Sequence, residues 1–232
     1  MKTIPKDSPS GLDLVFPMSI GWGEWDDFTP ANEAQGFAYR VLSTWLTHPD
    51  NPTWFPDDFQ EGMAMLIGPP GVGKTYLAHR LFSKVRRMYC ADAGEWPAIW
   101  VSAPSLMNWL PRAGDYWDFQ SSLLGADLFE DLSPFAKMVV SQWLFIDDLR
   151  EPRDKAERDF IVNLFDARTD QQPINTLSGV ITTNLDPDTL KRAYGERTFD
   201  RLNAGALWIP MLGNSLRRPQ ALRLERESEV NL

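Results

Sequence analysis

One segment constrains the fold of this chain more than any other, the eight residues GPPGVGKT at positions 68–75. They follow the apolar run Met63–Ile67 and precede a stretch in which apolar residues have helical spacing. The segment satisfies the pattern G-x-x-x-x-G-K-[ST], which joins a strand to a helix in one class of α/β proteins. Gly71 and Gly73 permit backbone angles that a β-carbon excludes. The first prediction is therefore an α/β fold built around a strand, this loop and a helix.

The same segment predicts a phosphate-binding loop. Backbone N–H groups of the loop, together with the N-terminus of the following helix, point at an anion. Lys74 supplies positive charge to the β- and γ-phosphates of a nucleotide, and the Thr75 hydroxyl is placed to bind Mg²⁺. The alternative is a Gly-Pro turn that matches the pattern by accident. The expected nucleotide-binding residues are Gly68, Pro69, Pro70, Gly71, Val72, Gly73, Lys74, Thr75 and Tyr76.

Short apolar runs alternate with helical patterns along the rest of the chain. The runs span residues 63–67, 98–101, 139–146, 179–182 and 206–209. Each has the length of a strand and is apolar on both faces, which is typical of parallel strands covered by helices. Helical spacing predicts helices over 32–46, 76–88 and 157–167. We therefore predict a three-layer α/β domain with a parallel five-stranded sheet over residues 31–232, after an irregular segment over 1–30.

Polar residues end two of the predicted strands. Asp147 closes the run WLFID and is predicted to hold Mg²⁺ with Thr75, while Asp148 is predicted to orient or deprotonate an attacking water. An ordinary transition from strand to loop is the alternative for these two acids. Asn184 ends the fourth run and reaches the γ-phosphate or its water if that strand lies between the other two, with Thr183 as the second choice. The alternative for Asn184 is a cap on the following turn.

Composition excludes several classes of protein. The single cysteine, Cys90, allows no disulfide within the chain, and with only two histidines no Cys/His zinc cluster can form. No stretch approaches the ~20 apolar residues of a membrane span and no signal peptide is apparent, so we expect a soluble, cytoplasmic protein. The net charge of −9 argues against a general nucleic-acid coat protein. Residues 189–226 are nevertheless basic, and they would suit phosphates or an acidic face of another copy.

Several motifs together resemble a known family. The segments GPPGVGKT, WLFIDDL, ITTNLD, GERTFDRL and GNSLR are similar to those of the DnaC-type helicase loaders and the related IstB-type transposition ATPases. Both belong to the AAA+ class of P-loop NTPases, and the resemblance runs from about Trp25 to Arg218. It implies ATP and Mg²⁺ as cofactors and the ASCE sheet order, with the strand of Asn184 between the phosphate-loop strand and the Asp147 strand. It also implies a homo-oligomer in which a neighbouring subunit completes the ATP site.

The resemblance further implies roles for arginines in the last part of the chain. Arg201, in FDRL, matches an arginine finger that acts in trans, and Arg197, in GER, matches a second arginine near that interface. A guanidinium there stabilises the charge that accumulates on the transferred phosphoryl group. Four residues apart, the two share one face of a helix, so a basic surface with ordinary ion pairs is the alternative. Arg217, in GNSLR, matches a terminal arginine that acts as a second sensor.

Three features depart from the family pattern. The residues before the phosphate loop are too few for the separate partner-binding domain that both relatives carry there, so we expect partner recognition to differ. The residues after Arg201 are too few for a C-terminal helical lid, which the resembled branch also lacks. Asp148 stands where glutamate is more usual, so we expect slow ATP hydrolysis.

The leading hypothesis is a DnaC-like AAA+ ATPase that self-assembles with ATP and helps to place a replicative helicase on single-stranded DNA in replication. Residues 102–137 occupy the place where this branch inserts helices that face the DNA. The aromatic residues there either stack on bases or form a buried cluster; they are Trp109, Tyr116, Trp117 and Phe119. The first alternative is an IstB-like ATPase that assembles on duplex DNA and recruits a transposase. The second is a monomeric P-loop kinase acting on a small molecule.

Overall fold

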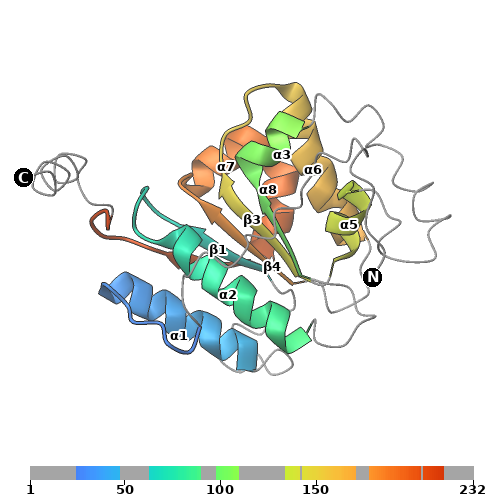
Figure 1. The fold of residues 1–232 in the computed structure, drawn as a ribbon. Helices are drawn as coiled ribbons and strands as arrows, with labels where there is room; N and C mark the ends of the chain where they lie inside the picture. The colour runs from blue at the N-terminus through green and yellow to red at the C-terminus, as the bar shows by residue number, and fades with distance from the viewer. Residues whose placement is uncertain are drawn as a thin grey trace, which may run out of the picture.

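Strands and helices alternate along the chain (Figure 1). The structure, a computed structural model, describes residues 25–47, 63–89, 98–109, 134–141, 143–170, 178–204 and 206–216. The strands are β1 (Met63–Ile67), β2 (Ala98–Ser102), β3 (Trp143–Leu149), β4 (Ser178–Thr183) and β5 (Ala206–Pro210). The helices are α1 (Glu33–Thr47), α2 (Lys74–Tyr89), α3 (Ala103–Trp109), α5 (Pro134–Val140), α6 (Lys155–Asp170), α7 (Pro187–Tyr194) and α8 (Glu196–Ala204).

The strands form one parallel five-stranded sheet in the order β2-β3-β4-β1-β5. β4 therefore lies between β1 and β3, so that Thr182 pairs with Leu66 on one side and Ile181 pairs with Ile146 on the other. This order is the one that the family resemblance implied, and the predicted parallel sheet is confirmed. Parallel strands end at a common edge, which brings together the residues that follow β1, β3 and β4.

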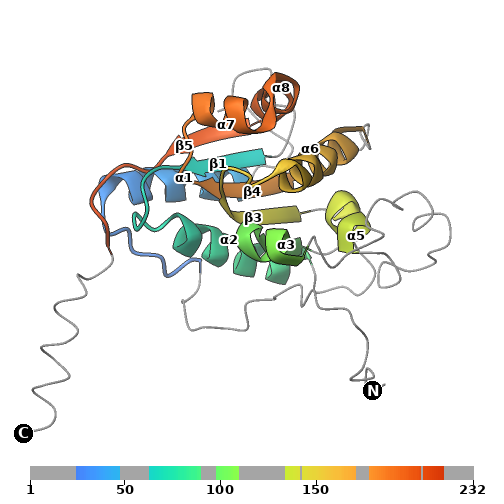
Figure 2. The ribbon, with the colours of Figure 1, turned by 90° about the horizontal axis from the view of Figure 1, so that it is seen from above.

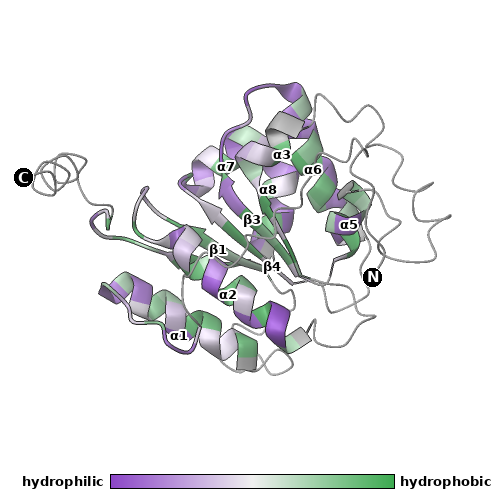
Figure 3. Ribbon diagram, viewed as in Figure 1, coloured by the Kyte–Doolittle hydropathy of each residue, from purple (hydrophilic) through white to green (hydrophobic). Residues whose placement is uncertain are grey.

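Two apolar cores, one on each face of the sheet, hold the helices in place. α1 and α2 pack into the first core, and α6, α7 and α8 pack into the second, on the other side of the sheet (Figure 2). Successive residues of β3 alternate between them, with Phe145 in the first core and Leu144 and Ile146 in the second. This alternation explains why the strands are apolar throughout (Figure 3). Burial of each such side chain stabilises the fold by about 1.5–3 kcal/mol.

The sequence prediction was wrong about where the third strand begins. Val139 was expected to start it, but the structure places this residue in α5 and begins β3 at Trp143. Val139 and Trp143 are both buried, so apolar residues lie on both sides of the boundary, with Ser141 and Gln142 as the polar residues between them. The boundary is set instead by Arg168, whose guanidinium donates to the carbonyl oxygens of Val139 and Ser141 at 3.1 and 3.0 Å, where α5 ends. This contact comes from a distant helix and leaves no local signal.

The segment before α1 packs against the domain although it forms neither helix nor strand over residues 25–32. Trp25 and Phe28 are buried in the first core, and the Phe28 ring lies 4.9 Å from that of Tyr39. Asn32 then starts α1, because its Oδ1 accepts a hydrogen bond of 2.9 Å from the Gln35 backbone N–H. Part of the expected irregular segment therefore belongs to the core.

Some sequence predictions lie outside the described residues. α3 and α5 occupy the two ends of the expected insertion over 102–137, but the middle of it is not described. The structure does not describe several residues selected from the sequence, namely the side chain of Trp109 and all of Tyr116, Trp117, Phe119 and Arg217. It also leaves out most of the chain after Arg201, to which the predicted lack of a lid refers. Among the described helices, none combines the length and the apolar character that crossing a membrane requires.

Candidate nucleotide-binding site

The loop between β1 and α2 has backbone angles that require glycine. The φ angles of Gly68, Gly71 and Gly73 are 155°, 86° and 96°, all in the region that residues with a β-carbon rarely adopt. Space is also restricted, because a β-carbon on Gly71 would lie 2.2 Å from Ser215 Oγ and one on Gly73 would lie 2.2 Å from Gln35 Nε2. Both the backbone conformation and the close neighbours therefore require glycine at these positions of the motif.

Gln35 of α1 forms a hydrogen bond with the phosphate loop. Sequence reasoning did not select this residue. Its side chain is 2% exposed. The Nε2 group donates to the carbonyl oxygen of Val72 at 2.9 Å, and Oε1 accepts from the Ala31 backbone N–H at 2.9 Å. The available signal was a glutamine placed between Ala34 and Ala38 on the apolar side of the predicted helix. An amide at that position must find buried partners, and here one of them is the loop itself.

Lys74 lies at the mouth of the loop with its ammonium group surrounded by oxygen atoms. Its Nζ donates to the carbonyl oxygens of Gly68 and Pro69 at 2.6 and 2.9 Å, and to Asn184 Oδ1 at 2.7 Å. Lys74 is buried, with only 7% of its surface exposed. The structure therefore brings together Lys74 and Asn184, although 110 residues separate them along the chain. Anionic phosphate oxygens are stronger acceptors for this ammonium than the neutral carbonyls it contacts here.

Thr75 and Asp147 meet where β3 ends beside the first turn of α2. The Thr75 hydroxyl donates to Asp147 Oδ1 at 2.8 Å. Burial raises the pKa of the Asp147 carboxyl above its ordinary range, and the nearby Asp148 carboxylate acts in the same direction, while hydrogen bonds from Thr182 and Thr75 oppose the rise. A hydroxyl beside a poorly hydrated carboxylate is a fitting set of ligands for Mg²⁺, which prefers oxygen donors and is stabilised by the negative charge. The residues present thus fit the metal that the sequence predicts.

Asp148 is held at the tip of β3 in an unusual backbone conformation. Its φ angle is 56°, the only positive value among the described residues other than glycine. The register between β3 and β4 shifts between Ile146 and Leu149, which marks a β-bulge at the two acids. Asn184 Nδ2 lies 3.4 Å from Asp148 Oδ1. The bulge thus places the exposed Asp148 carboxylate next to Asn184 and close to Asp147, where the sequence predicts activation of a water.

The other loop residues lie around this centre. Tyr76 packs on Phe28 at the edge of the first core, with ring centroids 6.0 Å apart. Pro70 is exposed at the turn of the loop. Thr183, the second choice of the sequence analysis, is instead turned toward the backbone, and its hydroxyl donates to the Leu149 carbonyl oxygen at 2.7 Å. Thr182, which the sequence analysis did not select, is the strand residue that contacts Asp147.

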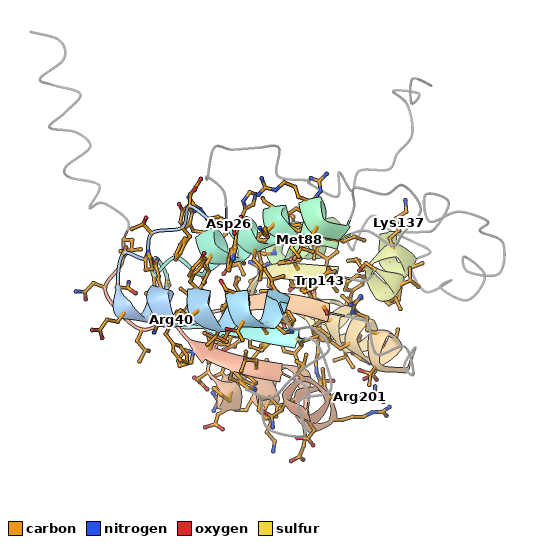
Figure 4. The ribbon with its side chains drawn as sticks, turned by 90° about the horizontal axis from the view of Figure 1, so that it is seen from below. Asp26, Arg40, Met88, Lys137, Trp143 and Arg201 are labelled. Carbon is orange, nitrogen blue, oxygen red and sulfur yellow. The ribbon has the colours of Figure 1, made fainter. Side chains whose placement is uncertain are left out.

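Arg197 and Arg201 belong to α8, which packs on the face of the sheet opposite α2. Figure 4 shows Arg201 on the far side of the sheet from α2. Arg201 forms an ion pair with Asp166 of α6, and the Arg197 guanidinium lies 3.9 Å from the same carboxylate. The two share one face of α8, as their spacing predicts. Within one chain both arginines therefore face an acid of another helix, rather than an acid one turn along α8 as the alternative interpretation expected. Arg197 remains largely in solvent, with 74% of its side chain exposed.

Comparisons with known proteins bear on the family and the fold of this chain. The sequence pattern of the ATPase family associated with various cellular activities (AAA) matches residues 64–205. A crystal structure of the DnaC helicase loader matches with a TM-score of 0.59 and 21% identity, covering 82% of this chain and 96% of that chain. The structure of DnaI matches with a TM-score of 0.55 and 16% identity, covering 82% and 91%.

AMPPCP-bound DnaA from Aquifex aeolicus matches with a TM-score of 0.55 and 15% identity, covering 90% of this chain and 56% of that chain. A comparison with curated proteins finds no match. At these identities the solved structures show a shared fold, and the predicted α/β P-loop fold of the DnaC-like type is confirmed. Since the family pattern spans more than half of the residues, the chain belongs to the AAA family of ATPases.

Proposed function

We propose that this protein is a Mg²⁺-dependent ATPase that assembles with ATP and helps to load a replicative helicase onto single-stranded DNA. The observation that carries the proposal is the junction of three strand ends at the phosphate loop. There Lys74 contacts Asn184 at 2.7 Å and Thr75 contacts Asp147 at 2.8 Å. These four side chains form a site for a triphosphate and its metal, built from residues that the AAA pattern spans.

In this proposal each residue of the site has one task. Lys74 exchanges the carbonyl oxygens of Gly68 and Pro69 for phosphate oxygens, and Asn184 orients the end of the triphosphate. Thr75 and Asp147 hold Mg²⁺, which neutralises charge on the phosphates when it is bound. Asp148 orients a water or accepts a proton from it. The aspartate side chain is shorter than that of glutamate, so its carboxylate reaches less far toward the water. We therefore expect slow turnover.

The shared site is part of the same proposal. Arg201 of one subunit contacts the phosphates bound by its neighbour, and Arg197 supports that interface. To do so Arg201 must leave Asp166, its ion-pair partner within the chain. Release of this partly buried pair requires a stronger anion, and a triphosphate on the adjoining subunit supplies one. ATP turnover then depends on assembly, so that hydrolysis occurs only where subunits have come together.

The replication partners are proposed from the relatives. One matching structure is described as a DnaC helicase loader, and another as the replication initiator DnaA bound to AMPPCP and single-stranded DNA. The proposal places residues 31–232 in the ATPase domain and the protein in the cytoplasm. The sequence supports the proposal through the basic composition of residues 189–226 and the aromatic residues of 102–137, residue types that suit a nucleic-acid backbone and its bases.

Binding to DNA in the presence of ATP tests this proposal against its first alternative. We expect a single-stranded oligonucleotide to bind at least about tenfold more tightly than a duplex of the same sequence, because stacking needs unpaired bases. Fluorescence anisotropy at one fixed salt concentration measures both affinities, with ADP and nucleotide-free samples as controls. A strong preference for the duplex would instead support an IstB-like protein that recruits a transposase. Transfer of phosphate to a small-molecule acceptor, with a rate per chain independent of protein concentration, would support a kinase.

The charge of Asp147 provides a test that links stability to function. Because burial raises its pKa, the folded protein holds this proton more tightly than the unfolded chain does, so ionisation lowers the free energy of unfolding. The penalty is complete above the pKa of the folded protein and disappears as the pH falls below about 3.8, the ordinary value. Asp147→Asn keeps an acceptor for Thr75 and Thr182. We expect it to raise the midpoint of thermal unfolding at pH 7 without nucleotide or metal, and to abolish Mg²⁺-dependent turnover.

Asp186→Asn is the matched control for this stability measurement. Asp186 caps α7, and the backbone N–H of Thr189 lowers its pKa rather than raising it. This substitution is therefore not expected to raise the melting temperature at pH 7. Scanning calorimetry between pH 3 and pH 8 measures both variants. A lower melting temperature for Asp147→Asn at pH 7 would show that its carboxylate stabilises the fold, contrary to the argument from burial.

A further inference from the structure

One hydroxyl group lies between the two acids of the candidate site. Thr182 Oγ1 donates to Asp147 Oδ1 at 2.7 Å, and the same oxygen accepts a hydrogen bond from the Asp148 backbone N–H at 2.9 Å. Thr182 is 1% exposed. A threonine hydroxyl has one proton to donate and lone pairs to accept with, so both capacities are used on consecutive residues of β3.

The β-bulge explains why a single residue reaches both acids. Ile146 pairs with Ile181 and Leu149 pairs with Thr183, so two residues of β3 stand opposite one residue of β4. The residue opposite the two acids is Thr182. A bulge of this kind disrupts the ladder of backbone hydrogen bonds. The side chain of Thr182 supplies the acceptor for the N–H of Asp148, the residue whose φ angle is 56°.

We propose that Thr182 is a positioning residue for ATP hydrolysis, whose hydroxyl fixes the Asp147 carboxylate for the metal and the Asp148 backbone for activation of water. The proposal deepens the proposed function and rests on it. Thr182 touches neither phosphate nor water in this role; it acts through the two acids. Asn184 follows directly after the same strand, so the end of β4 positions Asn184 as well as the two acids.

Thr183 provides a matched control on the neighbouring position. It is also buried, and its hydroxyl also holds the turn after β3, donating to the Leu149 carbonyl oxygen at 2.7 Å and accepting from the Leu185 N–H at 3.0 Å. Its contacts are with backbone groups and with neither acid. A purely structural role for these hydroxyls predicts similar effects from the two substitutions, whereas positioning predicts different ones.

The test compares Thr182→Val, Thr182→Ser and Thr183→Val with the unmodified full chain. For Thr182→Val we expect a 10- to 100-fold loss in kcat or in metal affinity, as for other groups that orient metal ligands. Affinity for metal-free ADP should stay within about twofold, since the phosphate loop is untouched. Thr182→Ser should recover most of the loss. Thr183→Val should lower the melting temperature and leave the Mg²⁺ dependence unchanged.

Two readouts besides turnover keep the proposal open to refutation. Electron paramagnetic resonance measures Mn²⁺ affinity in the presence of ADP, and a crystal structure of Thr182→Val measures the distance between Thr75 Oγ1 and Asp147 Oδ1, now 2.8 Å. We expect weaker Mn²⁺ binding and a distance beyond hydrogen-bond range. Unchanged values, or equal losses in Thr182→Ser and Thr183→Val, would overturn the positioning role. Failure of the unmodified chain to bind Mg²⁺ and nucleotide would contradict the proposed function, and the crystal structure would still decide whether Thr182 positions the acids.

Discussion

Replacement of Lys74 by alanine is expected to lower nucleotide affinity by roughly a hundredfold or more, because hydrogen bonds to a charged group contribute about 1.5–3 kcal/mol each and every 1.4 kcal/mol is a factor of ten. The ammonium group already lies among three oxygen acceptors at 2.6, 2.7 and 2.9 Å, in the position where phosphate oxygens would take their place. Titration calorimetry with ATP measures the loss. The fold should be retained, which circular dichroism verifies.

Lys84→Ala is the control for the charge itself. Lys84 lies on the same helix, and its Nζ pairs with Asp26 at 2.7 Å, away from the loop. Surface pairs of this kind contribute little, about 0–1 kcal/mol, so ATP affinity should stay within a factor of about two. Wild-type affinity in Lys74→Ala would remove the phosphate-loop assignment and with it the proposed ATPase.

Arg201→Ala is expected to lower the part of ATP turnover that depends on assembly by a factor of about 10³ or more. This is the contribution that an arginine finger makes to kcat in other NTPases. Affinity for ATP should change little in a lone subunit, because Arg201 contacts Asp166 there and lies on the face of the sheet opposite α2. Turnover measured across a range of protein concentrations separates the two effects. A variant that keeps full turnover at every concentration would contradict a shared site.

A mixing experiment makes the test in trans direct. Arg201→Ala subunits keep an intact phosphate loop, and Lys74→Ala subunits keep an intact arginine. In a mixed assembly some interfaces combine both intact halves, so turnover should rise above that of either variant alone. Lys191→Ala is the charge control, since Lys191 is an exposed residue of the neighbouring helix that pairs with Glu196. No recovery on mixing would place the two residues in the same subunit's site or show that Arg201 has no catalytic part.

Local patterns in the sequence were enough to predict the phosphate loop and the five strands, apart from the start of β3. β1 was placed without error, because a buried strand before a glycine-rich loop has a sharp end. Asp147 and Asn184 could be selected because polar residues at the ends of apolar runs are conspicuous. That they meet Thr75 and Lys74 depends on the order of strands, which only the family resemblance supplied.

The features that sequence reasoning missed arise from contacts between distant segments. The end of α5 depends on Arg168, and the bulge at Asp148 depends on the pairing of β3 with β4. Alternation of apolar residues does not encode such a shift in register. Thr182 was therefore not distinguishable from Thr183 in the sequence ITTN, although in the structure one contacts the Asp147 carboxylate and the other contacts backbone groups.

The contact between Gln35 and the phosphate loop has a mechanical consequence. A single amide connects α1 to the Val72 carbonyl oxygen, and the same side chain fills the space that Gly73 leaves. A displacement of α1 would therefore shift the Val72 backbone as well, so the position of the first helix and the shape of the phosphate loop are linked.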